Sequence, residues 1–250
     1  FGTLLGLAPG AVAVYSSDYD TADDDLLPDR HAYRSHVDGI YMGHKWQCVE
    51  FARRWLYINK GCIFDNVAMA YEIFELTSVR VVGDNALLPL KYFRNGAKRP
   101  PEPGCLLIWE AGGEFERTGH VAVVTEVSAH WVRFAEQNVG HAKWPAGRDY
   151  SREIKATVTD RNEYWLECSF GDATVLGWVI QTDDELHAET APVVDPKVLN
   201  MQPRELPDRG QTARSWLNMA NADEAAYVAM MGGHKLTSRA NDQFRFLCLS

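Results

Sequence analysis

The chain has 250 residues, of which 46% are apolar and 24% charged, an ordinary composition for a globular protein that can bury a sizeable core. Its formal net charge of −9, without a run of lysine or arginine, argues against nucleic acid and anionic membranes as partners. No apolar stretch approaches the roughly 18 residues of a membrane-spanning helix. The 5 cysteines form no Cys-x-x-Cys pair, which favours thiols in a reducing, cytoplasmic compartment over disulfides or zinc.

The first third of the chain is expected to hold the helices. A strand is expected over 12–15, followed by an acidic loop over 17–31, which is either a solvated surface or a rim that attracts a cationic ligand. Apolar residues then recur at helical spacing over 48–60, and Gly61 should end that helix. Asp65 is expected to cap a second helix that continues through Leu76.

The middle of the chain changes to the period of β-strands. Pro89 and the stretch 99–104 are interpreted as loops. Six segments are expected to be strands: 105–109, 121–127, 131–137, 155–159, 164–168 and 175–180. Helices followed by an antiparallel sheet indicate an α+β fold, with N-terminal helices packed on the sheet.

Composition divides the chain into three parts. Residues 1–185 are expected to form one domain, and the proline-rich stretch 186–211 a linker. Residues 212–250 are expected to begin a further, truncated region, and the start at Phe1 suggests a fragment whose true start lies upstream.

Three residues have the chemistry of a thiol hydrolase. Cys48 opens the predicted helix, whose N-terminus favours a thiolate. His120 begins a predicted strand after a glycine, and Glu136 lies near the end of the next one. If the two strands form a hairpin, an imidazole and the carboxylate that orients it lie at neighbouring strand ends on one side of the sheet, and the helix is expected to pack across that face. Gln47 could donate its amide, together with the Cys48 N–H, to an oxyanion.

Each of these residues also has an ordinary structural interpretation. A cysteine at a helix start is commonly an inert packed thiol, and a histidine at a strand start can be a satisfied core residue. Glu136 is more unusual, because a buried carboxylate needs a partner. The histidines show no zinc spacing, so no metal site is expected.

These motifs resemble a known family. The chain is similar to the N-terminal amidase domains of bifunctional glutathionylspermidine synthetase/amidases, members of the CHAP (cysteine, histidine-dependent amidohydrolase/peptidase) superfamily. The resemblance is dense over 1–185 and weaker beyond. The matching stretches are 1–6, 13–19, 41–54, 113–115, 118–122, 135–138 and 176–178.

The resemblance implies a papain-like fold and hydrolysis of the amide between glutathione and spermidine. It implies Cys48 as nucleophile, His120 as general base and acid, Glu136 as the residue that orients the imidazole, and Gln47 on the oxyanion side. The residues implied to hold the glutathionyl part are Gln47, Arg53, Val67, Ala68, Met69, Ala70 and Asn138.

The same resemblance sets expectations about cofactors and partners. The amidase needs no cofactor, and ATP and magnesium belong only to the absent synthetase half. The expected partners are the glutathione–polyamine conjugate and the protein's own synthetase half, with a homodimer left open. Two kinds of alternative remain. One is a CHAP peptidase or amidase that cleaves cell-wall peptide. The other is a non-catalytic domain, either a binder of glutathione conjugates or a redox sensor that uses Cys48 as a switch.

Overall fold

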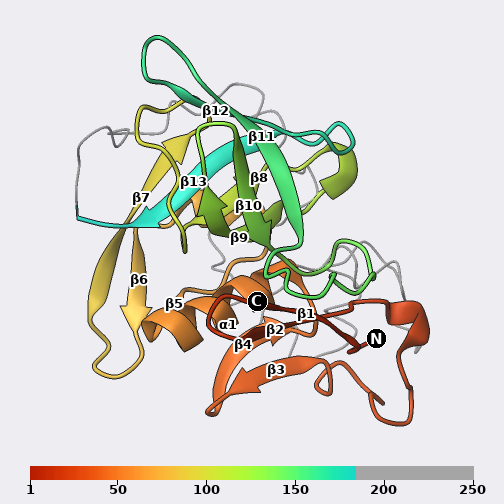
Figure 1. The fold of residues 1–250 in the computed structure, drawn as a ribbon. Coiled ribbons are helices and arrows are strands. Elements are labelled where there is room, and N and C mark those ends of the chain that lie inside the picture. The colour runs from red at the N-terminus through yellow and green to blue at the C-terminus, as the bar shows by residue number, and fades with distance from the viewer. Residues whose placement is uncertain (184–250) are drawn as a thin grey trace.

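The computed structural model describes residues 1–183, so the predicted linker 186–211 and the region 212–250 lie outside the described residues. A nine-stranded antiparallel sheet dominates this part of the chain, with the strand order β12-β11-β10-β9-β8-β13-β7-β6-β5 (Figure 1). Its strands are β5 (Cys62–Phe64), β6 (Ser78–Val81), β7 (Leu87–Arg94), β8 (Leu106–Trp109), β9 (His120–Val127), β10 (Trp131–Ala135), β11 (Arg152–Val158), β12 (Tyr164–Glu167) and β13 (Val175–Gln181).

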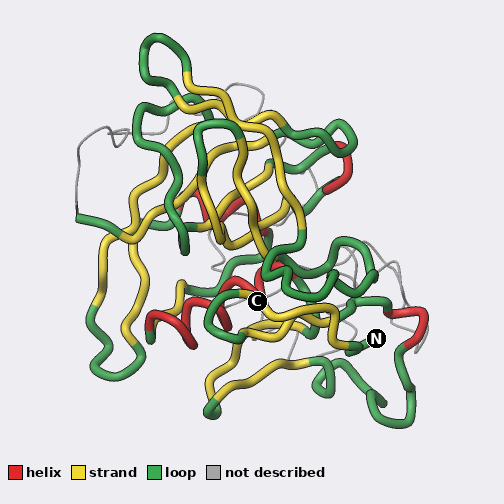
Figure 2. Tube along the Cα trace, in the orientation of Figure 1, coloured by secondary structure: helices red, strands yellow, loops and turns green. Residues whose placement is uncertain are grey.

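The N-terminal residues form two small sheets beside the helix. β1 (Leu4–Ala8) pairs with β2 (Val12–Tyr15), and β3 (Arg34–Val37) pairs with β4 (Ile40–His44). The helix α1 (Cys48–Lys60) contacts β2 and β4 on one side and β5 and β9 of the large sheet on the other. Figure 2 shows the same arrangement, with the single long helix between strands of the different sheets.

Helix α1 begins and ends where the sequence predicts. Its apolar residues Phe51, Ala52 and Leu56 are buried, and Gly61 takes a left-handed conformation as its C-cap. Strand β4 approaches the helix closely because Gly43 has φ 135°, and a Cβ there would meet the Glu50 Cα at 3.1 Å. Among residues 1–183, no helix combines the length and apolar character needed to cross a bilayer.

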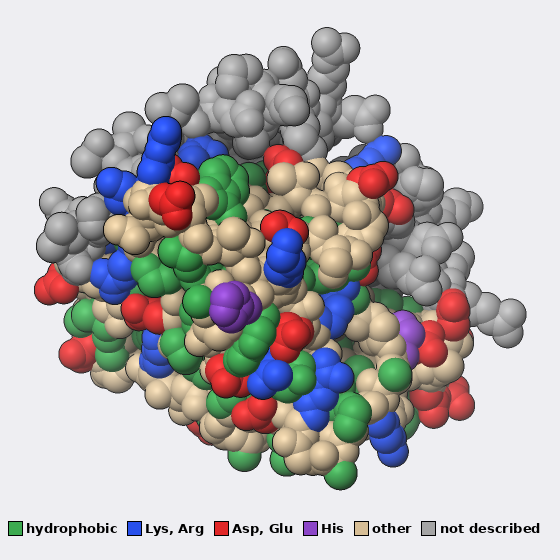
Figure 3. Space-filling view, turned by 45° about the horizontal axis from the view of Figure 1, so that its top comes forward, with side chains coloured by type: hydrophobic (Ala, Val, Ile, Leu, Met, Phe, Trp, Pro, Cys, Tyr) green, Lys and Arg blue, Asp and Glu red, His purple; other side chains and the backbone are tan. Residues whose placement is uncertain are grey.

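Both faces of the central strands are buried. Val121 and Val123 belong to the core cluster that also contains Cys48 and Phe51 of α1. Their neighbour Ala122 belongs to a second cluster on the opposite face. Burial on both faces explains why 105–109 and 121–127 read as continuous apolar runs. On the side of the molecule that Figure 3 shows, acidic and basic side chains are interspersed over the surface.

The structure confirms the fold class and all six strands predicted between residues 105 and 180, with ends that shift by at most three residues. The strand over 12–15 is also confirmed. The acidic stretch 17–31 is mainly loop, apart from the short 3-10 helix Tyr19–Thr21.

Two predictions in the middle of the chain are wrong. The expected second helix is the 3-10 helix Ala70–Glu75, so the sheet carries one α-helix in the described region rather than several. Asp65 does not cap it, because the Glu72 carboxylate instead accepts hydrogen bonds from the backbone N–H groups of Ala68 and Met69 at 2.8 and 3.1 Å. Pro89 lies within strand β7 rather than a loop, paired in register with Ser78.

Candidate active site

The predicted hairpin brings His120 and Glu136 together. β9 and β10 are antiparallel neighbours, His120 is the first residue of β9, and Glu136 directly follows the last residue of β10. The ring Nε2 of His120 lies 2.8 Å from the Glu136 Oε2, and both side chains are almost fully buried. The histidine ring is therefore held by a carboxylate at the end of the sheet.

Cys48 completes this group from the helix. Its side chain hydrogen-bonds to His120, and because Nε2 faces Glu136, the other ring nitrogen is left for the sulfur. The expectation that α1 packs across the face that carries His120 is wrong, because the helix packs on Val121 and Val123 of the opposite face. The contact forms because His120 is at the very end of its strand, where the N-terminus of α1 reaches it.

The charges of the three groups support one another. Burial opposes a charge on His120, but the Cys48 thiolate, the hydrogen bond to it and Glu136 outweigh burial and raise the His120 pKa to about 9. Burial would likewise raise the pKa of Glu136, but Arg152 and His120 lower it to about 2. An imidazolium in this position favours the thiolate form of a neighbouring cysteine.

The buried carboxylate of Glu136 has two further partners that the sequence did not reveal. Arg152 donates from Nε and Nη2 at 2.7 and 3.1 Å, and the Ser151 hydroxyl donates at 2.9 Å. The Arg152 guanidinium also lies 3.5 Å from the centroid of the Phe170 ring. The sequence indicated that a buried carboxylate at Glu136 needs a partner, but Arg152 becomes its neighbour only through the pairing of β10 with β11.

Aromatic rings fix the plane of His120. Its ring stacks on Phe115 with centroids 4.5 Å apart and planes inclined by 7°, and the Trp109 ring lies 5.5 Å away. Gly119 precedes the histidine with φ 61°, and a Cβ there would come within 2.5 Å of the Trp109 carbonyl oxygen. This glycine lets the chain enter β9 directly beside β8, and the His120 ring then lies against Phe115.

Gln47 is the N-cap residue of α1, and its side chain does not cap the helix. Its amide Nε2 donates to the Tyr19 hydroxyl at 2.7 Å, and its Oε1 accepts from the Asn138 Nδ2 at 2.8 Å. Asn138 in turn accepts a hydrogen bond from the Ser17 hydroxyl at 2.7 Å. Gln47 and Asn138 are therefore in direct contact, and they lie beside Cys48 and Glu136 in the chain.

A second buried network joins the segment that follows β10 to helix α1. Gln137 donates to the Glu50 Oε2 at 2.9 Å and accepts from Arg54 at 3.0 Å and from the Tyr15 backbone at 2.8 Å. Arg54 and Glu50 form an ion pair at 2.6 Å within α1, and Ser35 donates to the same carboxylate. Because Gln137 follows Glu136 directly, this network ties the segment with Glu136 to the first turns of the helix with Cys48.

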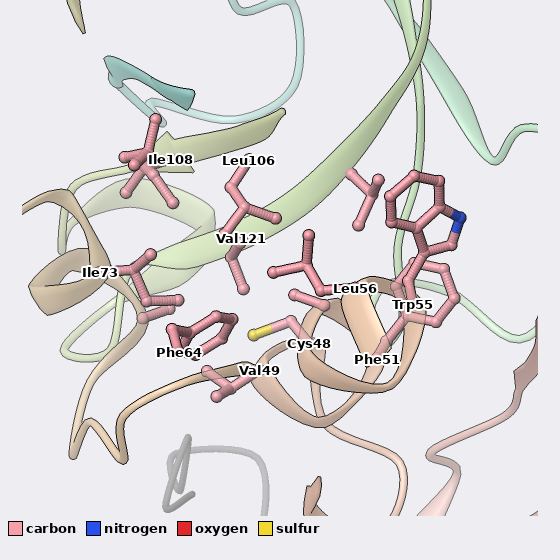
Figure 4. Packing of buried hydrophobic residues seen from close by; sticks show 14 of the residues in the cluster. Cys48, Val49, Phe51, Trp55, Leu56, Phe64, Ile73, Leu106, Ile108 and Val121 are labelled. Carbon is pink, nitrogen blue, oxygen red and sulfur yellow. The ribbon is translucent and has the colours of Figure 1, made fainter. Parts of the chain in front are cut away.

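Arg53 and the segment 67–70 lie near the same end of the helix. Arg53 is buried, donates to the Asn66 Oδ1, and lies 5.8 Å from the Phe64 ring centroid. The Cys48 sulfur points toward that ring in Figure 4. Ala70 donates its backbone N–H to the Thr118 carbonyl at 2.9 Å, which places the segment beside the chain that leads into His120.

An α+β fold in which a helix-start thiol meets an imidazole held by a buried carboxylate defines the papain-like class of cysteine–histidine folds. Residues 39–138 match the model of the CHAP domain. This part of the chain, which contains all three groups, is therefore a CHAP domain.

Comparison with characterised proteins finds similarity over most of the chain. It is 46% identical over 232 residues to the bifunctional glutathionylspermidine synthetase/amidase of Escherichia coli, covering 93% of this chain and 37% of that protein. It is 31% identical to the trypanothione synthetase of Crithidia fasciculata, covering 97% and 37%, and 33% identical to the glutathionylspermidine synthase of the same organism, covering 72% and 26%. The chain thus spans little more than a third of the length of these relatives, or less.

Proposed function

We propose that this domain is a cysteine-dependent amidase that hydrolyses glutathionylspermidine to glutathione and spermidine. The observation that supports it most is the unbroken chain of contacts from Cys48 through His120 to Glu136 and Arg152. The substrate is taken from the name of the Escherichia coli relative.

The reaction proceeds in two halves. The Cys48 thiolate attacks the carbonyl carbon of the glutathione glycine, and the electron pair of the C=O moves onto oxygen. His120 gives its proton to the spermidine nitrogen as the C–N bond breaks, which leaves a thioester. His120 then takes a proton from water as that water attacks the thioester carbon. The C–S bond breaks, its electron pair returns to the sulfur, and glutathione leaves with the Cys48 thiolate and the His120 imidazolium restored. Glu136 keeps the ring oriented and stabilises its charged form.

Other residues would hold the substrate. Gln47 adjoins the nucleophile, and its amide with the Cys48 N–H is proposed to stabilise the oxyanion; a donor of this kind contributes on the order of 3 kcal/mol. We assign the glutathionyl part to Arg53, Asn138 and the segment Val67, Ala68, Met69 and Ala70. Ala70 binds the chain that leads into His120, and Asn138 binds Gln47 next to Cys48. All atoms of the reaction come from substrate and water, so the proposal involves no cofactor.

The cellular setting is also part of the proposal. Cys48, Cys62, Cys105 and Cys168 are thiols, which supports a reducing compartment such as the cytoplasm. Because the relatives are much longer and are named as synthetases, we propose that a longer chain would place a synthetase part in contact with this domain.

Mass spectrometry of the protein incubated with glutathionylspermidine tests the function directly. Wild type should release equal amounts of glutathione and spermidine, Cys48→Ala should release neither, and Cys62→Ala, which removes a buried thiol on β5, should act as wild type. Neutral hydroxylamine should divert the acyl group of a thioester to the hydroxamate. Turnover by Cys48→Ala, or hydrolysis without a trapped hydroxamate, would refute the covalent mechanism.

A further inference from the structure

A cluster of cationic and aromatic side chains lies next to the nucleophile. Phe64, toward which the Cys48 sulfur points in Figure 4, also lies 5.8 Å from the guanidinium carbon of Arg53. That guanidinium is 6.0 Å from the centroid of the Tyr41 ring, and the guanidinium of Arg34 is 5.9 Å from the same ring. Tyr41 therefore has a cation near it from β3 and another from α1.

Two polar atoms of this cluster are buried without a hydrogen-bond partner among residues 1–183: the Arg53 Nε and the Tyr41 hydroxyl. Burial lowers the pKa of Arg53 to about 10, although Tyr41, Asp65 and Glu50 act against this effect. Burial also raises the pKa of Tyr41 to about 12, against the influence of Arg34 and Arg53. The arginine stays cationic and the tyrosine stays a protonated donor at neutral pH, and each has a donor unused in that part of the chain.

The nearby carboxylate of Glu50 does not accept hydrogen bonds from Arg53 or Tyr41. Glu50 is already bound by Arg54 at 2.6 Å, by Ser35 at 2.8 Å and by Gln137 at 2.9 Å. Within the described residues, neither Arg34 nor Arg53 has a carboxylate at ion-pair distance. A buried cation without a paired anion is costly, and this cost falls when an anionic ligand supplies the missing charge.

We propose that Arg34, Tyr41 and Arg53 together bind a carboxylate of the acyl part of the substrate. The inference rests on the proposed amide hydrolysis and adds Arg34 and Tyr41 to the expected role of Arg53. When the glycine carboxyl is joined to spermidine, the glutathionyl group keeps one carboxylate, on its γ-glutamyl residue. Arginine nitrogens match the two oxygens of a carboxylate, and the Tyr41 hydroxyl adds a third donor. The site would therefore select acyl groups that carry a remote carboxylate.

Steady-state kinetics of Tyr41→Phe test this subsite, because the change removes only the hydroxyl. A hydrogen bond to a charged group contributes enough to raise the KM for glutathionylspermidine about tenfold, while kcat stays within about twofold of wild type. Tyr57→Phe is the matched control: it removes an exposed hydroxyl on α1, which donates to Asp38 at 2.8 Å, and should leave both constants unchanged. Arg34→Gln should also raise KM, whereas Lys155→Gln on the distant strand β11 should not.

A substrate analogue separates this role from general damage. When a primary amide replaces the γ-glutamyl carboxylate, wild type should lose about 100-fold in kcat/KM and Tyr41→Phe only about tenfold, because the lost contact is shared. If Tyr41→Phe discriminates between acid and amide as strongly as wild type, the subsite proposal is wrong although the amidase function stands.

A binding measurement covers the case in which wild type does not hydrolyse the conjugate. Calorimetric titration of glutathione into Cys48→Ala, with and without Tyr41→Phe, measures binding of the acyl part without any turnover. Weakening by about fivefold or more supports the subsite. Equal affinity of the two proteins overturns it.

Discussion

Replacing Arg152 by methionine should uncouple the stability of the domain from the ionisation of Glu136. In the native structure Arg152 gives Glu136 two hydrogen bonds, at 2.7 and 3.1 Å, and is the leading cause that holds the carboxyl pKa at about 2 against the effect of burial. The ordinary value is 4.5. A carboxyl with a lowered native pKa stabilises the fold above its unfolded pKa, and this stabilisation is lost as pH falls through the native value.

The magnitude follows from these values. The difference between the native and unfolded pKa of Glu136 corresponds to about 3 kcal/mol at neutral pH. Removing one partner of a buried ion pair costs about 3–5 kcal/mol, so Arg152→Met should cancel most of this stabilisation and raise the native pKa of Glu136 most of the way back to its ordinary value. The difference in unfolding free energy between wild type and variant should stay about 3 kcal/mol from pH 7 to pH 5 and shrink to about half by pH 3.

Urea unfolding followed by tryptophan fluorescence at pH 7, 5 and 3 measures this difference. Arg133→Met is the control, because Arg133 also binds two carboxylates, Glu126 and Glu153, but all three side chains are partly exposed to solvent. This control should remain close to wild type at all three pH values. A deficit of Arg152→Met that stays the same at pH 3 as at pH 7 would show that Arg152 acts through packing and not through the charge of Glu136.

Three further outcomes are expected. In Cys48→Ala the His120 pKa should fall well below 9, because a thiolate is the first of the groups that raise it; an unchanged NMR titration of the ring would contradict the contact. The contribution of His120 to the free energy of unfolding should be complete below its ordinary pKa of 6.5 and should be lost as pH rises through about 9. Amidase activity should decline over the same range, and a pH–rate profile that is flat to pH 10 would argue against the ion pair. Gln137→Leu should cost about 2–3 kcal/mol, since it leaves Glu50 and a backbone N–H short of partners, and kcat should fall more than KM changes; kinetics identical to wild type would remove Gln137 from the positioning network.

The sequence predicted those parts of the site that depend on local pattern. The period of α1 placed Cys48 at its first residue, and the apolar runs of β9 and β10 predicted a hairpin with His120 and Glu136 at adjacent ends. The partners of the carboxylate could not be predicted in the same way. Arg152 reaches Glu136 through the next strand pairing, across a loop that no local rule determines.

The errors in the fold have physical causes as well. The sequence did not predict strand β7, because Pro89 lacks an N–H and is typical of loops. The structure nevertheless pairs Pro89 with Ser78 within the sheet. In place of the expected second helix the chain forms a short 3-10 helix that starts later, and its Glu72 side chain accepts hydrogen bonds from the N–H groups of Ala68 and Met69 just before it. The apolar spacing of this stretch does not distinguish such a turn from a longer helix. Both faces of β9 are buried, so its apolar pattern could not show on which face the helix packs.

The three successive side chains of Glu136–Asn138 bind three different partners. Glu136 binds His120, Gln137 binds Glu50 of α1, and Asn138 binds the side-chain amide of Gln47. Asn138 has φ 65°, so the backbone turns there. An insertion or deletion of one residue within this stretch would shift the side chains, so that His120, Glu50 and Gln47 would each face the wrong residue. Homologues and engineered chimaeras should therefore vary in length after Val139, in the stretch 140–150, and keep the spacing of these three residues constant.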